Sequence, residues 1–174
     1  MRLSFSVDQR AIKERFPDEE FQVFEQLEMT EIALWVGESV WGYPIMLSLH
    51  AVGLAILVGI FSMFYLRILG AFSGISLPAF LPLVKFAWVG FVINALSGLA
   101  LFTSQATTFV ESLPFLIKIG LISLGLIFAA FIQSEVRKSD EINEHVSVTI
   151  KCLAGLSMVV WIGAIISGRL IAYL

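Results

Sequence analysis

The chain has 174 residues, of which 58% are hydrophobic and 14% are charged, and its mean hydropathy is +0.90. A water-soluble domain averages about 25% charged residues, so this composition excludes an ordinary soluble protein and indicates a single membrane-embedded domain. The net charge is only −3 and the sequence has no basic patch, which argues against binding to nucleic acid.

Residues 1–38 are predicted to form an acidic extramembrane arm. They hold nine acidic and four basic residues, so the arm carries a charge of −5 and the rest of the chain +2. The run PDEE at 17–20 favours a helix start, because proline fits the first helical position and acids suit the positive end of the helix dipole. Phe21, Phe24 and Leu27 follow at helical spacing. The pattern predicts a short amphipathic helix that lies on the membrane or on a partner protein.

Four apolar stretches follow the arm. A helix rises about 1.5 Å per residue, so about 20 apolar residues cross a hydrocarbon core of about 30 Å. The predicted spans cover residues 43–66, 79–103, 114–133 and 147–173, joined by a turn at 70–78, a loop at 105–113 and a charged connection at 134–146. Thr30 is predicted to cap a short helix before the first span. The expected fold class is all-α: a polytopic membrane protein in which residues 39–174 form a four-helix antiparallel transmembrane bundle beside the arm.

Basic residues gather at one end of this predicted bundle. Five lie near the span ends on that side, namely Arg67, Lys85, Arg137, Lys138 and Lys151, and only Lys118 and Arg169 lie near the spans on the other side. Lys and Arg accumulate on the cytoplasmic side of membrane proteins. The sequence therefore predicts a multi-pass protein of a bacterial inner (cytoplasmic) membrane with both termini in the periplasm, the reverse orientation being the alternative.

His50 lies inside the first predicted span, about 6 Å outward from its centre. Ionisable residues at this depth usually face the interior of a bundle and mark functional sites. At the same depth, the second span carries Asn94 and Ser97, and the third carries Lys118. Arg169 lies higher, near the outer headgroups, and Glu38 precedes the first span on the same side. The outer half of the bundle is thus expected to collect these side chains.

This set of residues suits a cofactor. A neutral imidazole ligates a haem iron or a copper ion, or hydrogen-bonds a quinone carbonyl. Lys118 and Arg169 have the charge to hold haem propionates or another acidic group, and Met46, four residues before His50, would complete a thioether–imidazole pair for Cu(I). The second imidazole, His145, is expected more than ~20 Å away at the opposite face. A haem would therefore need a second ligand of another kind or a histidine from a neighbouring copy.

The surrounding sequence also resembles a known family. The segments ESVWGYPIMLSLHAVGLAILVG, FLIKIGLISL and WIGAIISGRLIAYL are similar to those of a widespread family of small four-helix bacterial inner-membrane proteins with no assigned activity. The resemblance covers residues 35–174, and the positions it carries over are Trp41, Tyr43, His50, Gly53, Lys118, Gly168, Arg169 and Tyr173. More loosely, a histidine in a four-helix membrane bundle is similar to copper-resistance membrane proteins and b-type cytochromes, which implies copper or haem as the ligand.

The favoured function is that of a membrane subunit for electron transfer. It would bind b-type haem or quinone through His50, with Lys118 and Arg169 at the polar edge and Asn94 and Ser97 in the same site. No hydrolase, nucleotide-binding or metalloprotease motif is present, so any enzymatic role is at most that of an electron-transfer subunit. In the plainer alternative, the histidine only hydrogen-bonds a neighbouring helix and the two cations reach the headgroups.

A second function of another class is a non-catalytic scaffold or accessory subunit that docks a partner through its acidic N-terminal arm. The expected partners are the lipid bilayer and either further copies of this chain or a larger membrane complex. A metal channel that uses Met46 and His50 ranks last, because the sequence has no inverted repeat.

Overall fold

The computed structural model describes residues 18–72, 74–138 and 146–171. These residues form helices and short connections, with no strand among them. Four helices are long and apolar enough to cross a membrane, namely α4 (Gly42–Ile68), α5 (Leu81–Thr103), α7 (Leu113–Lys138) and α8 (Val148–Leu170). The prediction of an all-α chain with four potential membrane spans is therefore confirmed. The charged connection predicted at 134–146 begins later, because α7 continues to Lys138.

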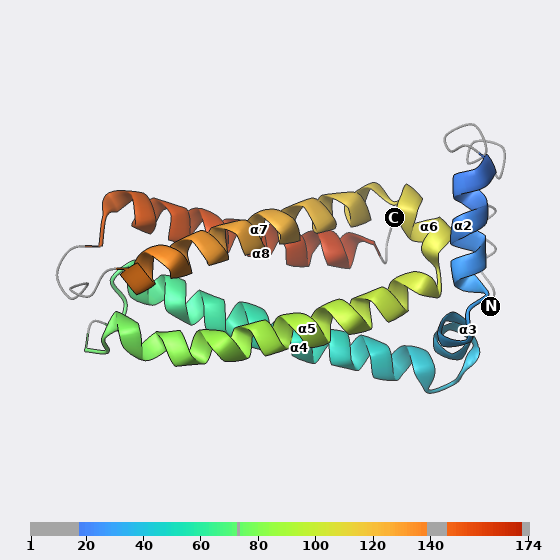
Figure 1. Cartoon of the computed structure of the whole chain (residues 1–174), viewed down its shortest axis with the longest axis horizontal. Helices are drawn as coiled ribbons and strands as arrows, with labels where there is room; N and C mark the ends of the chain where they lie inside the picture. Colours follow the sequence, from blue (N-terminus) through green and yellow to red (C-terminus); the bar gives the residue numbers. More distant parts are fainter. Residues whose placement is uncertain (1–17, 73, 139–145, 172–174) are drawn as a thin grey trace.

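The long helices are paired with their neighbours in sequence (Figure 1). Helix α4 packs along α5, and α7 packs along α8. The two pairs meet mainly where α4 contacts α8. The connection between α4 and α5 holds a short 3-10 helix, η1 (Leu77–Phe80), which also contacts α7. Any site between the pairs is therefore built mostly from α4 and α8.

Two glycines allow α4 and α5 to approach until their backbones touch. A Cβ atom added at Gly53 would lie 2.6 Å from the backbone nitrogen of Asn94, and one added at Gly90 would lie 2.9 Å from the backbone nitrogen of Leu57. Small residues at such positions are the usual means of close helix packing in membranes, where lipid supplies no hydrophobic drive between helices. This contact fixes the register that sets His50 beside Asn94.

The core between His50 and the connection from α4 to α5 is aromatic. The Phe61 ring is stacked on Tyr65 and Trp161 at centroid distances of 5.8 and 6.1 Å, and it meets the edge of Trp88 at 6.2 Å. Buried aliphatic residues such as Ile132 on α7 complete the same cluster. All four long helices thus meet in one core between His50 and the connection from α4 to α5.

The outer surface of the long helices is strongly apolar. Large side chains that are more than half exposed include Phe86, Leu96, Leu99, Ile127 and Val159. Water-soluble monomers rarely expose apolar surface on this scale. The surface is compatible with contact with a lipid bilayer.

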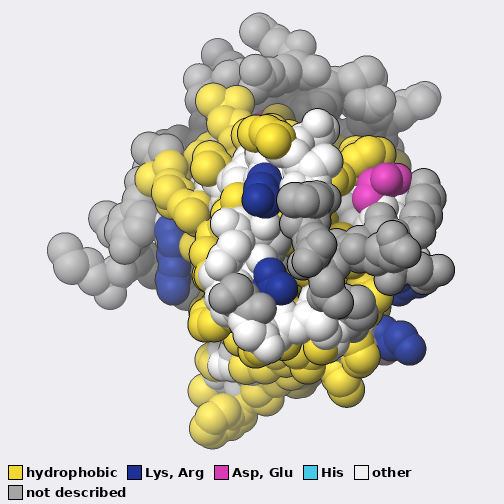
Figure 2. All heavy atoms as spheres, turned by 90° about the vertical axis from the view of Figure 1, so that its left-hand side faces the viewer, with side chains coloured by type: hydrophobic (Ala, Val, Ile, Leu, Met, Phe, Trp, Pro, Cys, Tyr) yellow, Lys and Arg dark blue, Asp and Glu magenta, His cyan; other side chains and the backbone are white. Residues whose placement is uncertain are grey.

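Among the described residues, one end of the molecule carries more basic than acidic side chains. Figure 2 looks at the end that carries the α4–α5 and α7–α8 connections, and Lys and Arg side chains outnumber acidic ones in this view. The described helix ends there carry Arg67, Lys85, Arg137 and Lys151. Arg67 also donates a hydrogen bond to the carbonyl of Ile75 in the connection between α4 and α5.

At the opposite end, α2 (Asp18–Glu28) lies across the end of the long helices (Figure 1) and is followed by α3 (Glu31–Glu38). Thr30 caps α3 as predicted, since its hydroxyl accepts a hydrogen bond from the Ala33 amide at 3.4 Å. The predicted loop at 105–113 instead contains a short helix, α6 (Ala106–Glu111). A Glu28 carboxylate oxygen accepts bonds from the amide (2.8 Å) and hydroxyl (2.7 Å) of Thr107, so α2 is tied to α6 of the same chain.

Candidate functional site

The site begins with a reciprocal link between α4 and α5. The His50 Nδ1 atom lies 2.9 Å from the carbonyl oxygen of Asn94, and the Asn94 side-chain amide donates to the carbonyl of His50 at 2.8 Å. Because a carbonyl only accepts, Nδ1 must carry the ring proton. The other ring nitrogen, Nε2, is therefore left with its lone pair free to accept a hydrogen bond or bind a ligand.

Ser97 and Gly98, also on α5, lie against the imidazole ring of His50. The Ser97 hydroxyl donates to the carbonyls of Ile93 (2.6 Å) and Asn94 (3.1 Å) and lies 3.5 Å from His50 Nδ1. A Cβ atom at Gly98 would lie only 3.0 Å from His50 Cε1. The ring therefore fits against α5 because position 98 has no side chain.

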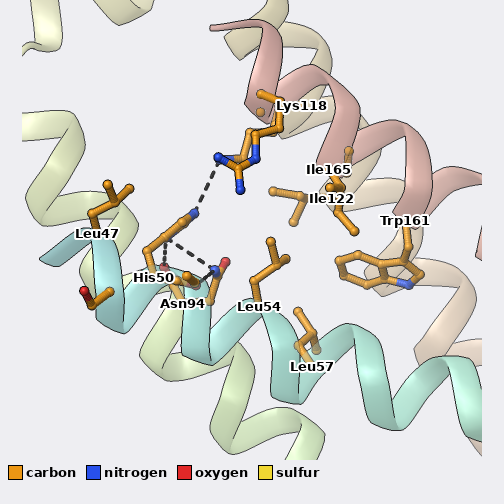
Figure 3. A pocket seen from close by; sticks show the side chains of 14 residues that line it. Leu47, His50, Leu54, Leu57, Asn94, Lys118, Ile122, Trp161 and Ile165 are labelled. Carbon is orange, nitrogen blue, oxygen red and sulfur yellow. Dashed lines mark hydrogen bonds between the residues drawn. The ribbon is translucent and has the colours of Figure 1, made fainter. Parts of the chain in front are cut away.

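Lys118 reaches the imidazole from α7. Its Nζ atom lies 3.4 Å from His50 Nε2, so the ammonium donates to the nitrogen that has no proton (Figure 3). Its aliphatic stem crosses α8 at Gly168, where an added Cβ atom would lie 3.4 Å from Lys118 Cδ, Cε and Nζ. Helices α4, α5 and α7 thus supply the side chains of one polar cluster, and α8 accommodates the Lys118 stem because Gly168 has no side chain.

His50, Asn94 and Lys118 line one end of a cavity of about 390 Å³ between the two helix pairs. Binding pockets for small molecules typically measure 300–1,000 Å³ and are mostly apolar with a few polar groups. The polar and cationic lining consists of Ser48, His50, Asn94, Lys118 and Arg169, and the remaining lining is Leu47, Ala51, Leu54, Leu57, Ile122, Trp161, Ala164, Ile165 and Gly168. Figure 3 shows the apolar side chains Leu54, Leu57 and Trp161 extending along the cavity away from His50.

The charge of the cavity is one-sided. Among the residues that the structure describes, no carboxylate lines it, and neither Lys118 nor Arg169 is paired with an acid. Arg169 is exposed, whereas Lys118 is partly buried. An unpaired cation in a largely apolar cavity favours a guest with an electron-rich or anionic head.

The structure brings together most of the residues that the sequence singled out. His50, Asn94, Lys118 and Arg169 line the cavity, and Ser97 supports the imidazole from behind. Met46 is not among the lining residues, although it is one turn from His50. No group of three His, Cys, Asp or Glu side chains suited to a metal ion occurs within the described ranges, and His145 lies outside them.

Two residues of the site, Gly98 and Trp161, were not predicted from the sequence. Gly98 lies one helical turn beyond Asn94. This spacing could have predicted that both residues face His50. Trp161, whose ring closes the apolar part of the cavity, had no such signal, because its partner residues come from other helices.

Comparison of the chain with protein-family models, with curated proteins and with solved structures gave no match.

Proposed function

We propose that this protein is an integral membrane subunit that binds a quinone in the cavity between its two helix pairs and serves electron transfer. The observation that supports this most directly is the pairing of His50 Nε2 with the Lys118 ammonium, 3.4 Å apart, at the head of an apolar cavity. A quinone combines polar carbonyl oxygens with an apolar ring and tail. The ammonium has three N–H donors, so it is suited to donate to a quinone carbonyl while it remains bonded to His50 Nε2.

A b-type haem is the competing guest. A haem iron bound to His50 would have to take the position beside Nε2 that the Lys118 ammonium holds. His50 is also the only histidine within the described residues, so one axial ligand would have to come from another side chain or a neighbouring copy. A Cu(I) ion bound to His50 Nε2 would lie beside the Lys118 ammonium and be repelled by it. Its second expected ligand, Met46, does not line the cavity. Quinone is therefore the guest that fits these contacts best.

We further propose that the four long helices form an antiparallel bundle in a bacterial inner membrane. The basic end, with Arg67, Lys85, Arg137 and Lys151, would face the cytoplasm, and the arm and both termini would lie on the periplasmic side. The cavity then belongs to the outer half of the bundle.

The test is a binding titration with the whole protein in nanodiscs of quinone-free lipid. Bound quinone should quench the fluorescence of Trp161, because this ring lines the cavity. We expect saturable quenching by a ubiquinone or menaquinone analogue in the wild type. Quenching should be abolished in His50→Phe and weakened about tenfold or more in Lys118→Met, since a hydrogen bond to a charged group contributes about 1.5–3 kcal/mol.

Lys85→Met is the matched control, because this lysine lies on α5 near the basic end and does not line the cavity. Its titration should equal that of the wild type. Equal quenching in wild type and His50→Phe would overturn the quinone assignment. A Soret band that shifts on reduction and is lost in His50→Phe would assign the site to haem instead.

The second candidate function is a membrane scaffold or accessory subunit that docks a partner, or another copy of the chain, through the arm. It is favoured by apolar side chains left exposed on and after α3, namely Ile32, Leu34, Trp35, Val40 and Trp41. Replacing Ile32, Leu34 and Trp35 with serine should then release a co-purified partner while quinone quenching is kept. Unchanged co-purification after these replacements, and also after deletion of residues 1–30, would exclude this role for the arm.

A further inference from the structure

Several residues that line the cavity are also exposed on the outer surface of the long helices. On α4, Leu47 is 47% exposed, and Ser48 and Ala51 are exposed as well. On α8, Arg169 is exposed, whereas Ala164 in the same lining is only 4% exposed. The cavity therefore reaches the surface of the molecule between α4 and α8, and we call this place the lateral opening.

The positions of these residues around their helices agree with an opening on this side. His50 faces α5, to which it is hydrogen-bonded, and Ala51 is rotated about 100° from it around α4. On α8, Trp161 faces the aromatic core, and Arg169, eight residues later, is rotated about 80° from it. Each helix thus turns one edge of its cavity-lining face toward the core and the other edge toward the surface.

The opposite side of the cavity, between α5 and α7, is closed by side-chain contacts. Toward α6, the rings of Phe102 on α5 and Phe115 on α7 are stacked with their centroids 5.5 Å apart. Toward the connection between α4 and α5, the indole of Trp88 on α5 donates a hydrogen bond to Gln133 Oε1 on α7 at 3.3 Å. The side between α4 and α8 is therefore the open side of the cavity.

We propose that the tail of the bound quinone leaves the cavity through the lateral opening, so that the site takes quinones whose apolar tail extends beyond it. This inference rests on the proposed function. With the quinone ring beside His50, the tail runs past Leu47 and Ala51 and continues among the lipid chains. The helix surface next to the opening suits this path, because the apolar side chains of Val52 on α4 and Ile166 on α8 are 53% and 55% exposed.

The test repeats the nanodisc titration with two analogues that share one quinone ring, one with a decyl tail and one with a methyl group in its place. Ala51→Phe puts an aromatic ring into the lateral opening. It should lower the affinity for the decyl analogue about tenfold relative to that for the methyl analogue, equivalent to about 1.4 kcal/mol. Ala55→Phe is the matched control, because Ala55 is exposed on the same helix and does not line the cavity. Its ratio of affinities should equal that of the wild type.

The outcomes separate this inference from the proposed function. If Ala51→Phe and the wild type have the same ratio of affinities, the exit through the lateral opening is overturned and quinone binding stands. If neither analogue gives saturable quenching in the wild type, both proposals are overturned.

A second measurement uses only the wild-type protein, so it also decides the case in which Ala51→Phe binds neither analogue. A quinone that carries a diazirine on its tail, beyond the first isoprene unit, is photolysed in nanodiscs, and the labelled peptides are identified by mass spectrometry. Labelling that an excess of unlabelled quinone prevents should fall on α4 and α8, near Ala51 and Arg169. Such labelling on α5 or α7 in place of α4 and α8 would overturn the proposal.

Discussion

At the scale of single residues, the two nitrogens of one imidazole have different tasks. His50 Nδ1 is fixed by the Asn94 carbonyl at 2.9 Å, which directs Nε2 toward Lys118 and the cavity. The proposed quinone site depends on this second contact, without which His50 would only join two helices. The depth of His50 and of its partners followed from counting residues along the spans.

The direction of each side chain around its helix did not follow from the sequence. Helix α4 is apolar on all sides, so its hydrophobic pattern does not mark which face turns inward. Met46 and His50 share a helix face by spacing, yet only His50 lines the cavity. The position of Lys118 depends equally on the missing side chain at Gly168, which a one-dimensional pattern does not report.

Gly98→Ala tests the seat of the imidazole. The new methyl group would lie 3.0 Å from His50 Cε1 and 3.1 Å from Nδ1, so the ring must move away from the Asn94 carbonyl. We expect quinone quenching to weaken about tenfold, equivalent to about 1.4 kcal/mol, while the helix content by circular dichroism is unchanged. Gly120→Ala is the control, because nothing lies within 4 Å of the Cβ it would add. Equal affinities in the two variants would contradict this role of Gly98.

At the scale of helices, the two pairs contribute different groups to the site. The α4–α5 pair, joined by backbone contact at Gly53 and Gly90, supplies the hydrogen-bonded imidazole, whereas α7 and α8 supply the two cations of the cavity. The four long helices were predictable from hydropathy alone. The short helix α6 was not, because ATTFVE is a six-residue stretch whose helical state depends on packing against α2 and α7.

Gly53→Ala should destabilise the fold by forcing α4 and α5 apart. The added carbon would lie 2.6 Å from the Asn94 nitrogen and 2.8 Å from the Gly90 carbonyl oxygen, and neither backbone atom can rotate away. Overpacking of this kind typically costs about 1–3 kcal/mol. Unfolding in bicelles measures the loss, with Gly59→Ala on the same helix as the control, since nothing lies within 4 Å of its Cβ. Similar stabilities of the two variants would show that the pair tolerates a wider spacing.

Glu28→Gln should loosen α2 from the rest of the molecule. The carboxylate accepts two bonds from Thr107, and the amide of glutamine replaces them with weaker neutral ones. We expect faster hydrogen exchange in α2 and α6, with exchange in the long helices unchanged. Glu25→Gln is the control, because Glu25 is an exposed side chain of the same helix. If the exchange rates of α2 are the same in both variants, other contacts hold this helix in place.

At the scale of the whole molecule, the composition and the charge distribution of the sequence predict the apolar surface and the difference between the two ends. The apolar surface that remains exposed on the long helices is what the hydropathy of the sequence predicted. The distribution of Lys and Arg gives the two ends different characters, which the proposed orientation uses. The relative placement of the two helix pairs was not predictable, because it depends on contacts between residues far apart in the chain.

The orientation can be tested with two engineered cysteines in a Cys152→Ser background, which removes the chain's single natural thiol. Gly74→Cys lies in the connection at the basic end, and Glu25→Cys lies in α2 at the opposite end. A membrane-impermeant maleimide added to spheroplasts should label position 25 and not position 74. Both positions should react once the membrane is permeabilised. The reverse labelling pattern would place the termini in the cytoplasm.

The location of the cavity determines which concentration of quinone controls its occupancy. His50, at one end of the cavity, lies eight residues into α4, which is about 12 Å along a helix apolar enough to cross a membrane. The quinone that we propose as the guest would partition into the bilayer first, so its mole fraction among the lipids, rather than its aqueous concentration, would set saturation. Diluting the same amount of guest with additional blank lipid should therefore empty the site, even when neither the buffer volume nor the protein content changes.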